Sequence, residues 1–151
     1  MNAIVRRMPS VARVVLGLVF TILGANKFLH FLPQPPMSGP PADFFGALFA
    51  TGYMLPLIAT TEVVAGLLLL SGRFVPLALT LLAPVIVNIL AFHLFLAPSG
   101  IAMPMVVLAA ELYLAWSYRE AFAPMLRARV APGGAEATRP ALRQAPASKA
   151  A

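Results

Sequence analysis

The chain has 151 residues, of which 60 % are hydrophobic and 11 % are charged, with a formal net charge of +6. A soluble domain carries about 25 % charged residues, so this composition excludes a soluble globule and also a disordered chain. The basic residues flank apolar segments, so the positive charge does not indicate a nucleic-acid partner. Because the chain has no cysteine, disulfides, CxxC redox pairs, thiolate zinc sites and covalently attached c-type haem are excluded.

Four apolar segments predict an all-α integral membrane protein, a bundle of four transmembrane helices. Each segment is near the ~20 residues that a helix needs to cross a ~30 Å hydrocarbon core. Each is apolar around most of the helix circumference, which favours membrane spans over amphipathic surface helices. The predicted spans are residues 11–32, 53–71, 75–96 and 101–118.

The loop between the first two spans is the only long loop on its side. It begins with a run of prolines, and Asp43 is placed to cap a short helix after them. Phe44, Phe45 and Phe49 follow Asp43 and suit an environment that is partly lipid. We expect a short interfacial or re-entrant helix here. The alternative is a plain connecting loop with an aromatic anchor.

The distribution of basic residues predicts the orientation of the bundle. Ten of the eleven lysines and arginines precede the first span, separate the second and third, or follow the fourth. The opposite loops, 33–52 and 97–100, carry none, so both termini are expected in the cytoplasm of a bacterial inner membrane. The chain then divides into a cytoplasmic N-terminus (1–10), a membrane domain (11–126) and a disordered cytoplasmic tail (127–151).

Five polar residues within the spans require an explanation, because a charge at the bilayer centre costs about 2.5–3.5 kcal/mol on insertion scales. Glu62 and Glu111 lie near the middle of the second and fourth spans, and Asn88 lies slightly outward of the middle of the third. Lys27 sits in the outer half of the first span. His93 follows Asn88 by five residues, about 140° around the helix, so it is not expected on the face of Asn88.

Small residues suggest that these polar faces turn inward, since small side chains beside a polar one favour helix contact in lipid. Glu62 shares its helical stripe with Ala59 and Gly66, and Lys27 shares its stripe with Gly24. We therefore expect a buried cluster of Lys27, Glu62 and Glu111, with Asn88 as a hydrogen-bond partner.

The charges of this cluster predict its chemistry. Two carboxylates and one ammonium leave one negative charge in a low-dielectric site, so one glutamate is expected to hold or share a proton. Glu62 and Glu111 are the expected catalytic groups, and Lys27, Asn88 and His93 the expected cofactor contacts. No metal or haem site is expected from the sparse histidines. The alternative is a polar staple that only fixes which helices pack together.

Several motifs together resemble the DoxX family of small four-helix membrane proteins, over residues 12–126. The resemblance rests on residues 12–20, 24–28, 51–53, 62–73, 83–89 and 111–116. It implies a membrane subunit of a quinone-linked oxidoreductase complex, with a quinone as possible cofactor and a protein partner beside the lipid bilayer. The family's polar positions fall on Lys27, Glu62, Asn88 and Glu111.

Three functions remain open at this point. The first is a quinone-binding or proton-relaying subunit of an oxidoreductase, in which Phe20, Phe28 and Phe92 flank a ring. The second is a non-enzymatic scaffold or assembly factor with a structural polar cluster. The third is a small proton-coupled transporter, which ranks last because the chain has no inverted internal repeat.

Overall fold

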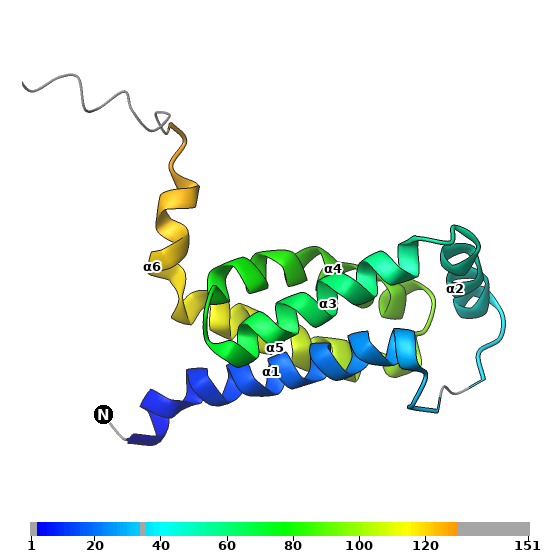
Figure 1. Cartoon of the computed structure of the whole chain (residues 1–151), viewed down its shortest axis with the longest axis horizontal. Helices are drawn as coiled ribbons and strands as arrows, with labels where there is room; N and C mark the ends of the chain where they lie inside the picture. Colours follow the sequence, from blue (N-terminus) through cyan, green and yellow to red (C-terminus); the bar gives the residue numbers. More distant parts are fainter. Residues whose placement is uncertain (1–2, 34–35, 130–151) are drawn as a thin grey trace, which may run out of the picture.

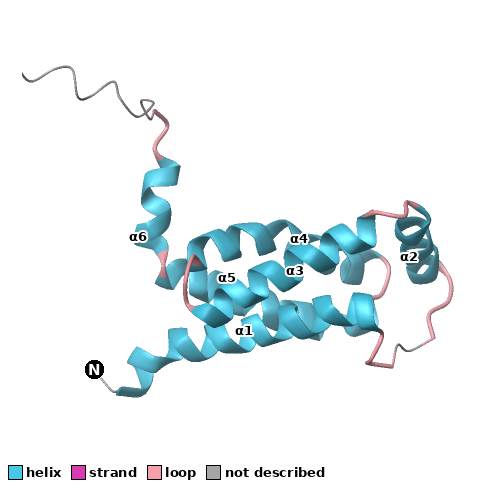
Figure 2. Ribbon diagram, in the orientation of Figure 1, coloured by secondary structure: helices cyan, strands magenta, loops and turns pink. Residues whose placement is uncertain are grey.

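The structure, a computed structural model, describes residues 3–33 and 36–129, and over these residues it contains helices and no strand (Figures 1 and 2). The predicted all-α class is therefore confirmed. The predicted disordered tail lies outside the described residues from residue 130 onward. The helices are α1 (Ala3–Leu29), α2 (Pro40–Ala50), α3 (Met54–Ser71), α4 (Val75–Phe95), α5 (Ala102–Ser117) and α6 (Arg119–Phe122), with short 3-10 turns η1 (Pro98–Gly100) and η2 (Ala123–Leu126).

Three helices are long and apolar enough to cross a membrane. They are residues Arg7–Leu29 of α1, Met54–Ser71 and Val75–Phe95. Helix α5 is also apolar but has 16 residues, about 24 Å at 1.5 Å per residue. The chain is thus a multi-pass membrane protein whose apolar helices contact the lipid bilayer.

Helix α1 is longer than its predicted span at the N-terminus and shorter at the C-terminus. It begins at Ala3, before the predicted start at residue 11, because a helix can continue beyond the apolar segment. It ends at Leu29 because His30 adopts a positive φ of 51°, which breaks the helical hydrogen-bond pattern. The buried Asn26 closes this end, since its side-chain oxygen accepts a hydrogen bond of 2.7 Å from the backbone N–H of Leu32.

The loop after α1 contains the predicted short helix, α2, which lies across one end of the bundle (Figure 1). We call this the α2 end. The prediction that Asp43 caps the helix is wrong. Gly39, with a φ of 66°, occupies the N-cap, and Pro40 and Pro41 form the first positions, where a missing N–H costs no hydrogen bond. Asp43 sits in the first turn without a capping bond.

Four long helices form a ring in which α1 packs against α3 and α5, and α4 packs against the same two helices. Helices α3 and α4 are joined by a tight turn in which Gly72 adopts a left-handed φ of 71°. The ring encloses an apolar core toward the end opposite α2. Its buried side chains include Leu16, Phe20, Leu69, Leu79, Leu82, Ile86 and Leu114.

Helices α1 and α3 make the most extensive contact, and glycines allow it. A Cβ added to Gly66 would lie 2.7 Å from the backbone nitrogen of Thr21 and 2.9 Å from the carbonyl oxygen of Gly17. A Cβ on Gly24 would lie 2.9 Å from the Cβ of Glu62. Small residues therefore bring the two backbones together, as the sequence predicted, and they place Lys27 beside Glu62.

At the opposite end of this contact, Arg13 of α1 binds the C-terminus of α3. Its guanidinium donates hydrogen bonds to the carbonyl oxygens of Leu69 and of Leu70, the latter at 3.2 Å. A Cβ on Gly72 would lie 2.9 Å from the guanidinium. A cation at the C-terminus of a helix satisfies carbonyls that lack partners within the helix and complements the helix dipole.

Candidate functional site: a cavity beside a buried ion pair

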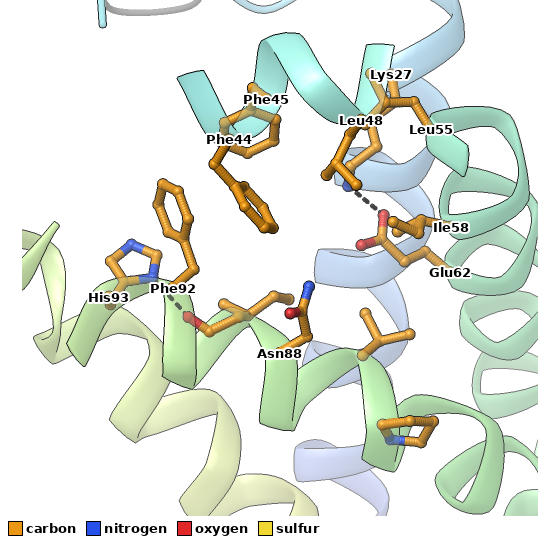
Figure 3. A pocket seen from close by; sticks show the side chains of 13 residues that line it. Lys27, Phe44, Phe45, Leu48, Leu55, Ile58, Glu62, Asn88, Phe92 and His93 are labelled. Carbon is orange, nitrogen blue, oxygen red and sulfur yellow. Dashed lines mark hydrogen bonds and ion pairs between the residues drawn. The ribbon is translucent and has the colours of Figure 1, made fainter. Parts of the chain in front are cut away.

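A cavity of about 290 Å³ lies between α3 and α4 beneath α2, near the end of α1 (Figure 3). Small-molecule sites are commonly about 300–1,000 Å³, so this cavity suits a ligand of one ring. Most of its wall is apolar. The lining residues are Lys27, Phe44, Phe45, Leu48, Leu55, Ile58, Glu62, Pro84, Val85, Asn88, Ile89, Phe92 and His93.

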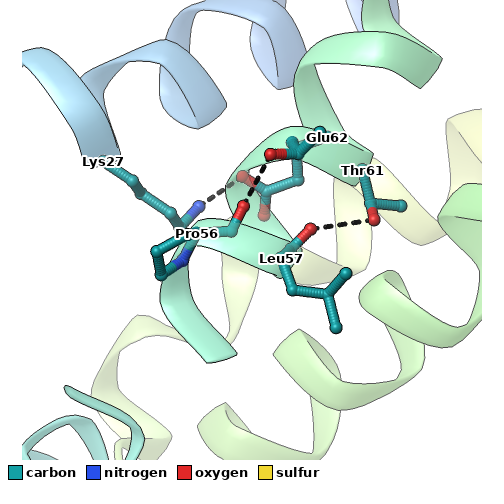
Figure 4. Close-up of polar contacts among 6 residues, drawn as sticks. Lys27, Pro56, Leu57, Thr61 and Glu62 are labelled. Atoms are coloured by element: carbon teal, nitrogen blue, oxygen red, sulfur yellow. Dashed lines mark hydrogen bonds and ion pairs between the residues drawn. The ribbon is translucent and has the colours of Figure 1, made fainter. Parts of the chain in front are cut away.

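An ion pair forms one wall of the cavity. The ammonium of Lys27 donates to the Oε2 atom of Glu62, and the two side chains come from adjacent α1 and α3 (Figures 3 and 4). The Glu62 side chain is 3 % exposed and that of Lys27 is 29 % exposed. Because Glu62 is buried and Lys27 reaches the cavity, a ligand bound in the cavity can contact the ion pair without any movement of the helices.

The threonines beside Glu62 do not join this pair. The hydroxyls of Thr60 and Thr61 donate to the carbonyl oxygens of Pro56 and Leu57, one turn earlier in α3, at 2.7 and 2.9 Å (Figure 4). Such bonds satisfy hydroxyl groups within their own helix. Glu62 is therefore the polar side chain that α3 presents to the cavity.

On α4, Asn88 faces the same cavity from a wall opposite the ion pair (Figure 3). Its side chain is exposed, and it makes no hydrogen bond to any residue that the structure describes. The helix continues through Pro84, one turn earlier, whose ring nitrogen cannot donate to the carbonyl of Thr80. The amide of Asn88 is thus available to a ligand.

His93 lies at the rim of the cavity, next to Phe92 (Figure 3). Its Nδ1 donates to the carbonyl oxygen of Ile89 at 2.8 Å, which leaves Nε2 to contact a ligand. His93 was not expected on the helical face of Asn88, yet both residues line the cavity, which extends far enough around α4 to reach both. Gly100 leaves room for the imidazole, since a Cβ there would lie 2.9 Å from its Cδ2.

Aromatic rings cover the cavity at the α2 end. Phe44 and Phe45 of α2 lie 5.5 and 5.3 Å from the ring of Phe92, measured between centroids. The sequence indicated a lipid environment for these phenylalanines of α2, but not their contact with α4, because the course of a loop is not encoded in helical periodicity. Of the phenylalanines expected to flank a ring, Phe92 lines the cavity, whereas Phe20 is buried in the core and Phe28 is 48 % exposed outside the cavity.

Of the four polar residues predicted to cluster, Glu111 is the one that does not line this cavity. Glu111 lies on α5 and is 6 % exposed, and its Oε2 atom has no hydrogen-bond partner among the described residues. The structure therefore brings together Lys27, Glu62, Asn88 and His93 at one cavity. Over residues 3–33 and 36–129, no three potential metal ligands converge.

Comparison with known proteins identifies a family. The family model described as DoxX matches residues 8–94, more than half of the chain, which includes most of α1, all of α2 and α3, α4 as far as Leu94 and every residue that lines the cavity. No curated protein and no solved structure matches the chain.

Proposed function

Because this chain belongs to the DoxX family of membrane proteins, we propose that its cavity binds the single ring of a quinone for a partner oxidoreductase. The observation that carries the proposal is the buried Lys27–Glu62 pair, which opens on a mostly apolar cavity covered by phenylalanines. A cavity of about 290 Å³ fits one ring better than a larger fused cofactor.

Each polar residue has a role in this proposal. A bound quinone would take up two electrons from the partner and two protons, one by way of Glu62 and one from the aqueous phase, to become a quinol. Glu62 transfers a proton at the buried end, while Lys27 stabilises its carboxylate and donates a hydrogen bond. Asn88 and His93 contact ring oxygens from α4. Glu111, the second buried carboxyl, is proposed to hold a proton on α5, outside the cavity.

Binding tests this function directly. We expect purified protein to retain a quinone that solvent extraction and chromatography detect, and a short-tailed benzoquinone to raise the unfolding temperature. Glu62→Gln should weaken that binding about tenfold, because it removes the carboxylate that orients Lys27. The control is Glu120→Gln, which changes an exposed glutamate of α6 and should bind as wild type does. The proposal would be contradicted if the purified protein retained no quinone, added benzoquinone did not raise its unfolding temperature, and Glu62→Gln behaved as wild type does.

The second candidate is a structural role for the ion pair, and the position of the pair between α1 and α3 favours this role. The pair links α1 to α3 next to Gly24, where a Cβ would lie only 2.9 Å from the Cβ of Glu62. In this case the protein is a scaffold or assembly factor that recruits another membrane protein. Glu62→Gln would then lower thermal stability and abundance, and it would leave benzoquinone binding per folded molecule unchanged.

We also propose that α5 is a fourth span and that both termini are cytoplasmic in a bacterial inner membrane. The basic residues support this orientation, since the loops on the α2 end carry none. The native chain has no cysteine, so single cysteines report topology without background. Ser38→Cys, before α2, should react with a membrane-impermeant maleimide added to intact spheroplasts. Ser71→Cys, at the α3–α4 turn, should react only after permeabilisation, and the reverse pattern would invert the topology.

A further inference from the structure

The exposed part of the cavity wall lies on α4. Among the 13 residues that line the cavity, eleven are buried or half-buried, and the two exposed ones are Pro84 and Asn88. Both lie on α4, one turn apart. The opening is therefore in the wall formed by α4 and not in the roof formed by α2.

The position of this opening along α4 indicates that it faces the lipid. Pro84 and Asn88 are near the middle of Val75–Phe95, a helix long and apolar enough to cross a membrane. The neighbouring Val87 is 61 % exposed, as expected for a side chain that faces lipid. The opening thus faces acyl chains, far from either aqueous phase.

Access to the cavity from the aqueous side, at the α2 end, is blocked by aromatic side chains. Phe44, Phe45 and Phe92 contact one another at the α2 end, with centroid separations of 5.3 to 5.8 Å. Leu48 of α2 adds to this cover and is half-buried. A ligand that came from the aqueous side would have to separate these rings, whereas one in the lipid meets an existing opening.

We propose that the ligand of this cavity is an amphiphile dissolved in the bilayer, which enters sideways between α3 and α4 at Pro84 and Asn88. Its ring lies beneath the phenylalanines, and its apolar tail stays in the lipid along α4. The amide of Asn88, which has no partner among the described residues, hydrogen-bonds the ring at the opening. This inference rests on the proposed ring-binding function, to which it adds the tail and the route.

Exchange of a tritiated, decyl-tailed benzoquinone between nanodiscs and empty vesicles measures this route. Asn88→Trp should fill the opening and slow exchange at least tenfold, whereas Asn88→Leu should weaken binding without slowing entry. The matched control is Val87→Trp, which adds the same bulk beside the opening and should exchange as wild type does. Leu48→Trp adds bulk to the roof and tests the other route, so it should slow exchange less than Asn88→Trp does. Exchange slowed by Leu48→Trp and unaffected by Asn88→Trp would establish an aqueous route and overturn the proposal.

A second measurement needs no ligand, so it separates this proposal from the ring-binding function. A nitroxide attached at Asn88→Cys should collide with lipid-soluble oxygen and be protected from a water-soluble nickel chelate. A nitroxide at Ser38→Cys should show the opposite behaviour. Nickel access at position 88 would overturn lateral entry. Oxygen access there, with no benzoquinone bound by wild-type protein, would refute ring binding alone.

Discussion

Lys27→Met should lower the unfolding temperature of the purified protein by roughly 6–12 °C, the equivalent of about 3 kcal/mol for a chain of this size. Methionine preserves the length and apolar stem of lysine but removes the ammonium. Glu62, whose side chain is 3 % exposed, would then remain in the bundle without its cation. Breaking a buried pair on one side is costly because the remaining charge is uncompensated.

The double variant Lys27→Met with Glu62→Leu makes the prediction specific. Removal of both charges eliminates the uncompensated group, so the double variant should be more stable than Lys27→Met alone. Arg119→Met is the control, because this arginine is exposed on α6, where it donates to the carbonyl oxygen of Trp116 and lies 5.5 Å from the centre of the Trp116 ring. Equal unfolding temperatures for Lys27→Met and wild type would show that the pair does not stabilise the contact of α1 with α3.

Gly66→Ala should be more damaging still, and we expect little folded protein to be recovered. The added methyl would lie 2.7 Å from the backbone nitrogen of Thr21 and 2.9 Å from the carbonyl of Gly17, both fixed by α1. Backbone atoms cannot move aside as a flexible side chain can, so the helices must separate. Size-exclusion chromatography and the unfolding temperature of the recovered fraction measure the effect, which should exceed 3 kcal/mol on the scale of about 1–3 kcal/mol for overpacking.

Gly46→Ala is the matched control, because Gly46 also lies within a helix and a Cβ there would meet nothing within 4 Å. Alanine favours a helix over glycine by about 0.5–1 kcal/mol, so this variant should be unchanged or slightly more stable. If Gly66→Ala folds as well as Gly46→Ala does, the close approach of α1 to α3 is not required.

The fold was largely predictable because lipid imposes strong limits on sequence. The helices near 53–71 and 75–96 follow from apolar segments of membrane-spanning length, and their observed bounds differ by one residue at most. The pairing of Lys27 with Glu62 was also predictable, since both lie at similar depth and each has a small residue on its helical face.

The set of polar residues that line the cavity was not predictable, because periodicity gives the face of a helix but not its neighbour. Glu111 is buried, as expected, yet it is not among the residues that line the cavity. A short helix was expected at this end of the bundle, but the contact of its phenylalanines with α4 was not. Phe44 and Phe45 reach the cavity through the course of the loop after α1, and nothing in the local sequence fixes that course.

The bond between Arg13 and the end of α3 has a consequence for biogenesis. Helix α1 precedes the α3–α4 hairpin in the chain, so the arginine is in place before its carbonyl partners are made. Only a hairpin inserted with its turn on the arginine's side completes these bonds. An inverted hairpin would leave a guanidinium at the membrane boundary and the terminal carbonyls of α3 unsatisfied. The contact is therefore complete only in the topology in which the turn of the later hairpin lies beside Arg13.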